Sequence, residues 1–178
     1  MSKDNKAASK AAPWDKGYCA PDPLYAPEQA ALMARLRNDV SERLWGKRLK
    51  HSFGVAATAL WLARRCGVDE FEAEAAGLLH DWDKKLSPEE LWGKVDEYGI
   101  DVPRVDGALP VLHGLTAAAS LPRDYPELGA EVFQAIARHT TGAPGMTDLD
   151  MVVYVADMIE PGREGGFVDD IRKLACTA

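Results

Sequence analysis

Residues 77–86 read GLLHDWDKKL, and this stretch carries polar and charged side chains into a place where the pattern predicts a protein core. An apolar helical face running from Ala73 to Leu79 leads directly into His80 and Asp81. Burying a carboxylate without a partner costs roughly several kcal/mol, even after relaxation. We therefore expect this helix to deliver His80 and Asp81 to a functional site.

The composition is that of one globular domain. The chain has 178 residues, of which 47% are hydrophobic and 28% charged, so it can bury a substantial core. Its formal net charge is −7, from 21 basic and 28 acidic side chains, which argues against a broad surface for nucleic acid or for an anionic membrane. A small phosphorylated ligand held by a few local cations is compatible with this charge.

The cysteines and the N-terminus indicate where in the cell the protein is expected to be. Cys19, Cys66 and Cys176 are far apart and form no CxxC pair, which favours reduced thiols and a cytoplasmic location over a disulfide framework. The N-terminus lacks the apolar segment of a signal peptide. No run approaches the ~18 apolar residues that would suggest a membrane span.

The pattern after residue 26 is helical almost throughout, and it predicts an all-α fold in a single domain over residues 27–178. Residues 1–26 are polar and rich in Ala and Pro, so we expect them to form a flexible tail. Three residue pairs have the spacing of helix-capping signals: Asp69 with Glu72, Ser87 with Glu90, and Thr147 with Asp150. The expected helices cover residues 27–45, 48–66, 69–81, 88–99, 113–121, 126–138, 147–160 and 167–175.

Four histidines and two aspartates lie on buried or terminal faces of these predicted helices. The candidate metal ligands are His51, His80, Asp81, His113, His139 and Asp157. A single histidine on an apolar face is more often a satisfied core residue than a ligand, but cations readily explain the six together. Mixed imidazole and carboxylate ligands suit iron, manganese or zinc rather than calcium, and six exceed the need of a structural zinc. We expect an open, central catalytic site, which holds either one metal or two metals bridged by Asp81.

The ligands stand in five sequence motifs: RLKHSFGVA, AGLLHDWDKKL, LHGLTAA, ARHTTGAPGM and DMVVYVADMIEPGR. Over about residues 26–174 the chain resembles the HD-domain metallophosphohydrolases, and within them the YqeK-type symmetrical bis(5'-nucleosyl)-tetraphosphatases. The specific part is HTTG-x-PGM followed by D-x-I-E-P-G-R. The resemblance implies a helical HD fold and hydrolysis of diadenosine tetraphosphate into two ADP by a metal-activated water. It also implies dinuclear iron as the cofactor, with manganese or another divalent transition metal as the alternative.

Cationic and hydroxyl side chains near these motifs are candidates for binding phosphate. Lys84 matches the HD-x-x-K pattern and is expected to contact the departing phosphate, so Lys84 and Asp81 are the candidate catalytic residues. Arg163 offers a planar guanidinium for bidentate binding of phosphate. Arg48 lies one helical turn before His51 and can face the metals. Neutral hydrogen bonds are expected from Thr140, Thr141 and Gly142.

Each of these candidates has a simpler interpretation. In these simpler interpretations, Lys84 is only an ion-pair partner of Asp83, Arg48 is only part of the solvated KRLK patch, and Thr140 is only a helix cap. Asp83 itself is left out of the metal set, since the adjacent Lys84 and Lys85 favour a surface ion pair.

Other functions use the same ligand set. One is a different HD nucleotide phosphohydrolase, such as a nucleotidase, and another is a mixed-valent di-iron oxygenase. A non-catalytic HD module that binds a nucleotide is the non-enzymatic alternative. The expected partner is a dinucleoside polyphosphate or another nucleotide, with no nucleic acid and no membrane. Trp45, Trp61 and Trp92 are candidates for the core or for a homodimer interface. The resemblance implies a further C-terminal helix after the last residues of this sequence, so we expect either that the domain is truncated at residue 178 or that its pocket is closed differently.

Overall fold

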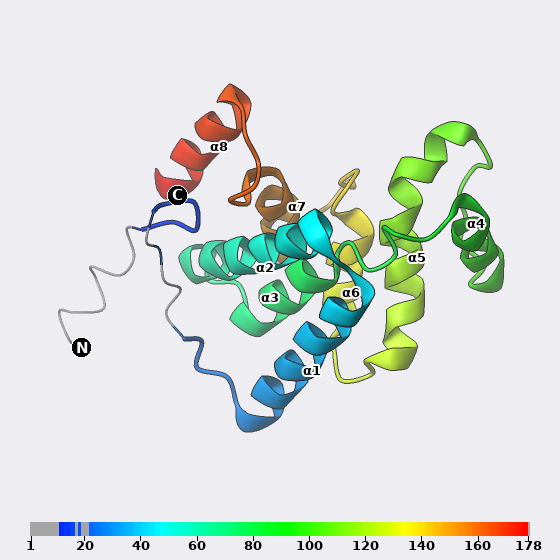
Figure 1. Ribbon diagram of the computed structural model, residues 1–178, viewed down its shortest axis with the longest axis horizontal. Coiled ribbons are helices and arrows are strands. Elements are labelled where there is room, and N and C mark those ends of the chain that lie inside the picture. Colours follow the sequence, from blue (N-terminus) through cyan, green and yellow to red (C-terminus); the bar gives the residue numbers. More distant parts are fainter. Residues whose placement is uncertain (1–10, 17, 19–21, 178) are drawn as a thin grey trace.

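The computed structural model describes residues 11–16, 18 and 22–177, and this part of the chain contains helices and no strand. The predicted all-α fold is therefore confirmed. The helices are α1 (Pro27–Arg43), α2 (Gly46–Cys66), α3 (Glu70–Leu79), α4 (Pro88–Glu97), the short η2 (Asp106–Ala108), α5 (Leu109–Asp124), α6 (Ala130–Arg138), α7 (Asp148–Ile159) and α8 (Gly166–Thr177). Figure 1 shows α2, α3 and α6 in the middle, with α4 and α5 at one end of the molecule and α8 at the other.

The predicted helix starts are confirmed by hydrogen bonds at the helix ends. Complete capping boxes begin α4 and α7, formed by Ser87 with Glu90 and by Thr147 with Asp150. At the start of α3 the side chain of Asp69 accepts a hydrogen bond from the backbone N–H of Glu72. Gly67 ends α2 in the left-handed conformation, with φ of 72°.

Two helices, α5 and α6, begin four residues away from their predicted starts. α5 begins at Leu109, ahead of the predicted start at His113, because Pro110 is tolerated in the first turn of a helix. α6 begins at Ala130 rather than at residue 126, because Gly129 has an extended N-cap conformation. The longer α5 places His113 inside a helix, where the packing of neighbouring turns fixes the direction of its side chain.

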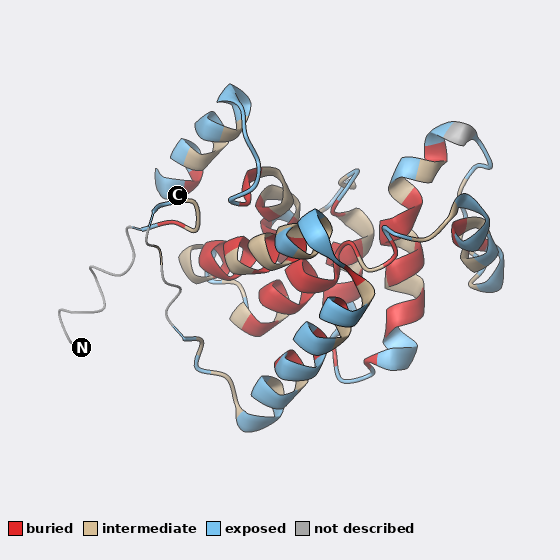
Figure 2. Cartoon of the chain, viewed as in Figure 1, coloured by how far each residue is buried: buried red, intermediate tan, exposed pale blue. Residues whose placement is uncertain are grey.

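Most helices bury one face in a common core, whose buried residues are red in Figure 2. Fully buried members of this core include Leu36, Val55, Leu79, Ile136 and Ile159. α2 and α3 approach each other closely at Gly77, where a Cβ would lie 3.0 Å from the Cα of Ala56. This close packing sets the direction in which α3 delivers its last residues. A smaller apolar cluster joins α4 to α5.

Residues 11–16, which belong to the predicted flexible tail, pack against the helices. Ala12 is fully buried, and the ring of Trp14 meets the ring of Trp61 edge-on at 5.2 Å between centroids. The guanidinium of Arg172, in α8, lies over Trp14 at 5.0 Å. Trp14 and the buried Ala12 therefore hold residues 11–16 against the helices, although the composition of this segment predicts flexibility. The remainder of the predicted tail that lies outside the described residues comprises 1–10, 17 and 19–21.

The three tryptophans considered for the core or for an interface differ in exposure. Trp61 is buried in the main core, and Trp92 is half-buried against the smaller cluster. Trp45 is 63% exposed, with the ammonium of Lys85 4.6 Å from the centre of its ring. A homodimer stays a prediction.

Two expectations concern the cysteines and membrane spans. Cys66 and Cys176 are exposed free cysteines, whereas Cys19 lies outside the described residues. Among the helices that the structure describes, none combines the length and the apolar character needed to cross a membrane.

Candidate metal centre

The structure brings the six candidate ligands together from five helices. α2 carries His51, α5 carries His113, α7 carries Asp157, and the ends of α3 and α6 carry His80-Asp81 and His139. Most of the set is buried, whereas the side chains of His51 and Asp157 keep 11% and 20% of their surface exposed. The cluster therefore opens to solvent on the side where α2 meets α7.

The imidazole rings meet through their Nε2 atoms. The Nε2 atoms of His51 and His80 lie 3.2 Å apart, and those of His113 and His139 lie 3.0 Å apart. The ring centroids of His80 and His139 are 4.9 Å apart, so the two pairs are continuous. Four nitrogen atoms that can each offer a lone pair thus converge on one small volume.

The Asp81 carboxylate lies between the two pairs of imidazoles. Its Oδ2 atom is 3.4 Å from Nε2 of His80 and 3.6 Å from Nε2 of His51. Its Oδ1 atom is 3.2 Å from Nε2 of His113. On the open side, Oδ1 of Asp157 is 3.1 Å from Nε2 of His51. The two oxygens of Asp81 therefore face different histidines, as a bridging carboxylate would require.

Backbone carbonyls set the tautomers of two histidines. Nδ1 of His80 lies 2.7 Å from the carbonyl oxygen of Gly77, and Nδ1 of His139 lies 2.7 Å from that of Ile136. A carbonyl oxygen can only accept a hydrogen bond, so Nδ1 carries the proton in both rings. Their Nε2 atoms are then left as acceptors that face the cluster.

Burial and neighbouring charges favour the ligand forms of these groups. Burial, together with the charges of His80 and His113, lowers the pKa of His139 to about 3. Burial by itself would raise the pKa of Asp81, but the facing imidazoles of His80 and His113 hold that pKa well below its usual range. At neutral pH His139 is thus neutral and Asp81 is ionised, and these are the forms that bind metals.

The donor atoms fit divalent metal ions. Three overlapping groups have ligand atoms that all lie within 4.8 Å of one another: His51, His80 and Asp81; His80, His139 and Asp157; and Asp81, His113 and His139. Imidazole nitrogens with carboxylate oxygens form a mixed nitrogen and oxygen set, which suits a divalent transition metal. No single tetrahedral ion needs this many ligands.

Three cations and one hydroxyl lie against the ligands. The guanidinium of Arg48 is 2.5 Å from Oδ2 of Asp81, and that of Arg163 is 2.6 Å from Oδ1 of Asp157. The ammonium of Lys84 is 3.3 Å from both ring nitrogens of His113. The hydroxyl of Thr140 is 2.9 Å from Nε2 of His139. Four of the six predicted phosphate contacts thus border the cluster.

The other two predicted phosphate contacts use their hydrogen bonds within the loop after α6. The exposed hydroxyl of Thr141 donates to the carbonyl oxygen of Gly142. The backbone N–H of Gly142 donates to the carbonyl oxygen of Arg138 at 2.8 Å, so it is already occupied. Gly142 instead provides a left-handed turn with φ of 65°.

Asp83 lies outside the ligand cluster, but the predicted surface ion pair with Lys84 or Lys85 is wrong. Its side chain is fully buried and pairs with Arg43 at 2.8 Å and with Lys94 at 2.7 Å. These partners belong to α1 and α4, which close over the turn after α3. Asp83 therefore anchors the residues that follow the His80-Asp81 pair.

Glu160 is a site residue that sequence reasoning missed. It is buried, and its Oε1 atom lies 3.1 Å from Nδ1 of His51. Burial lowers the pKa of His51, but hydrogen bonds to Asp157 and Glu160 outweigh burial and raise that pKa to about 9. The signal in the sequence was the spacing of Asp157 and Glu160, which are three residues apart and so lie on one face of a helix.

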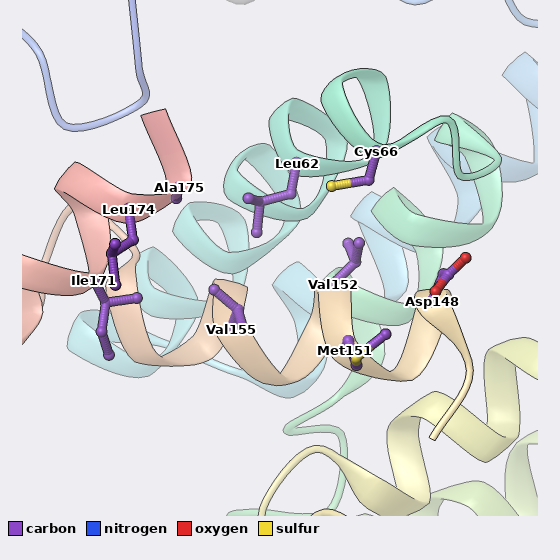
Figure 3. Close-up of a pocket in the computed structure, with 9 residues that line it drawn as sticks. All are labelled: Leu62, Cys66, Asp148, Met151, Val152, Val155, Ile171, Leu174 and Ala175. Atoms are coloured by element: carbon purple, nitrogen blue, oxygen red, sulfur yellow. The ribbon is translucent and has the colours of Figure 1, made fainter. Parts of the chain in front are cut away.

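An apolar groove on the other side of α7 is separate from the metal centre. It has a volume of about 440 Å³, and its lining residues are labelled in Figure 3. Figure 3 shows Leu62 and Cys66 of α2, Val155 of α7 and Leu174 of α8 around this space. Asp148 supplies its one ionisable carboxylate, and none of the six candidate ligands lines it. This groove is therefore unsuited to phosphate.

A family model described as "HD domain" matches residues 48–162, which include all six candidate ligands. The chain therefore belongs to the HD domain family.

The chain is also similar in sequence and in structure to individual HD-domain proteins. The chain is 37% identical over 138 residues to "Bis(5'-nucleosyl)-tetraphosphatase, symmetrical" of Bacillus subtilis, covering 78% of this chain and 74% of that protein. It is 38% identical over 134 residues to the protein of the same name from Staphylococcus aureus, covering 75% and 69%. A solved structure from Clostridium acetobutylicum, described as a "predicted HD superfamily hydrolase involved in NAD metabolism", superposes with a TM-score of 0.73 at 35% identity, over 81% of this chain and 77% of the other.

Proposed function

We propose that this protein is a metal-dependent hydrolase that cleaves diadenosine tetraphosphate symmetrically into two ADP. The observation that carries the proposal is the cluster of six imidazole and carboxylate side chains, bordered by three cations. The similarity to two proteins named as symmetrical bis(5'-nucleosyl)-tetraphosphatases supports the choice of substrate.

The proposed cofactor is a pair of divalent metal ions that share Asp81. Support comes from the two oxygens of the Asp81 carboxylate, which face different histidines. Oδ2 is near His51 and His80, whereas Oδ1 is near His113. When bound, such ions supply an activated water and offset negative charge on phosphate oxygens. Iron is the metal that the sequence motifs imply, and manganese is the alternative; the donor set suits both.

Arg48 and Arg163 are proposed to bind the phosphate chain. Their side chains are 34% and 45% exposed, so each guanidinium can turn from its carboxylate to a phosphate oxygen. Guanidinium groups bind phosphate in a bidentate manner, which fixes orientation as well as charge. Because the two arginines contact different ligands, Asp81 and Asp157, they can hold separate phosphates of one substrate.

Lys84 is proposed to stabilise the departing phosphate. Symmetric hydrolysis adds one water across the bond between a central phosphorus and the central bridging oxygen, and negative charge develops on that oxygen. Burial lowers the pKa of Lys84, and the carboxylates of Asp81 and Asp157 act in the opposite direction. An ammonium group beside the cluster can neutralise the developing charge without reorganisation. Thr140 is proposed to donate a neutral hydrogen bond to the same phosphates, and its hydroxyl beside Nε2 of His139 supports this.

Three further properties are predictions of the sequence analysis alone. They are iron as the metal used, assembly as a homodimer, and a cytoplasmic location. The apolar Trp45 is exposed and offers one surface on which the homodimer can be sought.

The test is chromatography of reactions with diadenosine tetraphosphate, run with protein loaded anaerobically with iron or with manganese. We expect ADP as the sole initial product and no turnover by a His80→Ala variant. AMP with ATP would contradict symmetric cleavage. Oxygen uptake that depends on substrate would favour the oxygenase alternative, and tight nucleotide binding without turnover in metal-loaded protein would favour a binding module.

A further inference from the structure

Glu160 lies directly behind His51, on the side away from the other ligands. We propose that Glu160 is a positioning residue, which fixes the orientation and the tautomer of His51 so that Nε2 is presented to the metal centre. This inference rests on the metal centre of the proposed function. Oε1 of Glu160 is 3.1 Å from Nδ1 of His51, while Nε2 of the same ring is 3.1 Å from Oδ1 of Asp157.

The chemistry of the contact determines where the proton lies. An ionised carboxylate can only accept a hydrogen bond, so Nδ1 of His51 must donate to Glu160. Nε2 is then the nitrogen that can give up its proton and bind a metal. A carboxylate behind the ring also makes the imidazole a stronger ligand than a neutral partner would.

The carboxylate is itself held in place from several sides. Its Oε2 atom accepts a hydrogen bond of 2.6 Å from the backbone N–H of Gly162. The backbone carbonyl of Glu160 accepts one of 2.6 Å from the guanidinium of Arg172. On the facing helix, a Cβ at Gly54 would lie 2.6 Å from Oε2, so a glycine there leaves the necessary space. Glu160 is 4% exposed and cannot easily leave this position.

The position of His51 explains why it needs such a partner. His80 and His139 follow the ends of their helices, where each Nδ1 atom reaches a carbonyl oxygen three residues earlier. These carbonyls belong to the last turn of a helix and have no helical partner. His51 lies inside α2, where the preceding carbonyls bind backbone N–H groups. Its partner must therefore come from another element, and α7 supplies Glu160 at its C-cap.

The test measures metal binding rather than activity. Binding of Mn²⁺ to metal-free protein is followed by the electron paramagnetic resonance signal of the free ion. We expect Glu160→Ala to weaken Mn²⁺ binding by about 10–100-fold. Glu160→Gln should weaken it less, because the amide oxygen can still accept from Nδ1. The matched control is Glu164→Ala, an exposed carboxylate of the same loop, which should leave binding unchanged.

A double-mutant cycle separates positioning of His51 from support of the turn at Gly162. If Glu160 acts through His51, Glu160→Ala should have no further effect on Mn²⁺ binding in a His51→Ala background. Melting temperatures of the metal-free variants show which of them fold. Glu160→Gln keeps the side-chain volume and replaces Glu160→Ala in the cycle if the alanine variant unfolds.

The Mn²⁺-binding results test the role of Glu160 without any substrate present. Wild-type affinity in both Glu160 variants, or an equal loss with and without His51, would overturn it. Weakened binding that disappears in the His51→Ala background would support it. That support would hold even if diadenosine tetraphosphate were not cleaved, in which case the proposed function alone would fail.

Discussion

Two neighbouring lysines after the His80-Asp81 pair provide a matched test of the phosphate site. Lys84 lies 3.3 Å from the ring nitrogens of His113, whereas the ammonium of Lys85 lies over the exposed ring of Trp45. We predict that Lys84→Ala lowers kcat/KM for diadenosine tetraphosphate by about 100-fold, because a preorganised donor to the leaving oxygen is lost. Lys85→Ala should change kcat/KM less than about twofold, as expected of a surface substitution. Steady-state kinetics measure both, and equal effects would argue against a role for Lys84 at the reacting phosphate.

The candidate metal ligands could be picked out from the sequence, and the structure brings them together, but some of their neighbours could not be predicted. The ligand set was visible because the chain has only four histidines, each on the buried or terminal face of a different predicted helix. Glu160 and Asp83 were missed or misplaced because their partners are remote in sequence. Glu160 contacts His51 across 109 positions, and Asp83 contacts Arg43 across 40. Only the packing of α7 on α2 and of α1 on the turn after α3 creates these pairs.

At the scale of elements, the crossing of α5 and α6 controls His139. A Cβ at Gly114 of α5 would lie 2.9 Å from the carbonyl oxygen of Ile136 and 3.0 Å from Cε1 of His139. We predict that Gly114→Ala destabilises the fold by about 1–3 kcal/mol, because the two helices must move apart. It should also weaken metal binding, since the displaced carbonyl orients His139. Urea denaturation and Mn²⁺ titration measure the two effects.

The matched control for that substitution is Gly93 in α4, where a Cβ would meet nothing within 4 Å. Gly93→Ala should stabilise the protein by about 0.5–1 kcal/mol, because alanine favours the helix more than glycine does. Metal affinity should not change. Destabilisation by Gly93→Ala comparable to that by Gly114→Ala would contradict the assignment of the Gly114 effect to the close approach of α5 and α6.

α8 supports the turn that carries Glu160 and Arg163. The guanidinium of Arg172 donates to the carbonyl oxygens of Ile159, Glu160 and Arg163. We predict that Arg172→Ala costs about 1–3 kcal/mol of unfolding free energy, because it leaves these acceptors without their donor. The exposed neighbour Lys173 forms a surface ion pair with Asp170, and Lys173→Ala should cost less than about 0.5 kcal/mol. Equal midpoints of urea unfolding in the two variants would contradict this role of α8.

Local signals in the sequence predicted the elements better than the contacts between them. The starts of α4 and α7 were predictable because a cap and its partner are three residues apart. The start of α5 was not, because Pro110 can either precede a helix or lie in its first turn. The packing of residues 11–16 was not predictable either, because it depends on the contact of Trp14 with Trp61 and Arg172 from distant helices.

At the scale of the whole molecule, the metal centre joins five helices, so metal binding should stabilise the entire fold. A ligand that binds only the folded state at 100 times its Kd adds about 2.7 kcal/mol of stability. We predict that Mn²⁺ raises the Tm of metal-free protein and that a chelator reverses the change. A His80→Ala variant should show a much smaller shift. An unchanged Tm in the wild type at saturating Mn²⁺ would contradict a centre built from these helices.

The central claim is that water attacks a central phosphorus of diadenosine tetraphosphate at this site. The most direct measurement is mass spectrometry of the products formed by metal-loaded protein in water enriched in heavy oxygen. We predict ADP as the only initial product, with half of the ADP molecules carrying one heavy oxygen on the β-phosphate and the other half carrying none. Heavy oxygen in AMP or ATP would place the attack at another phosphorus, and ADP without the label would exclude water as the nucleophile.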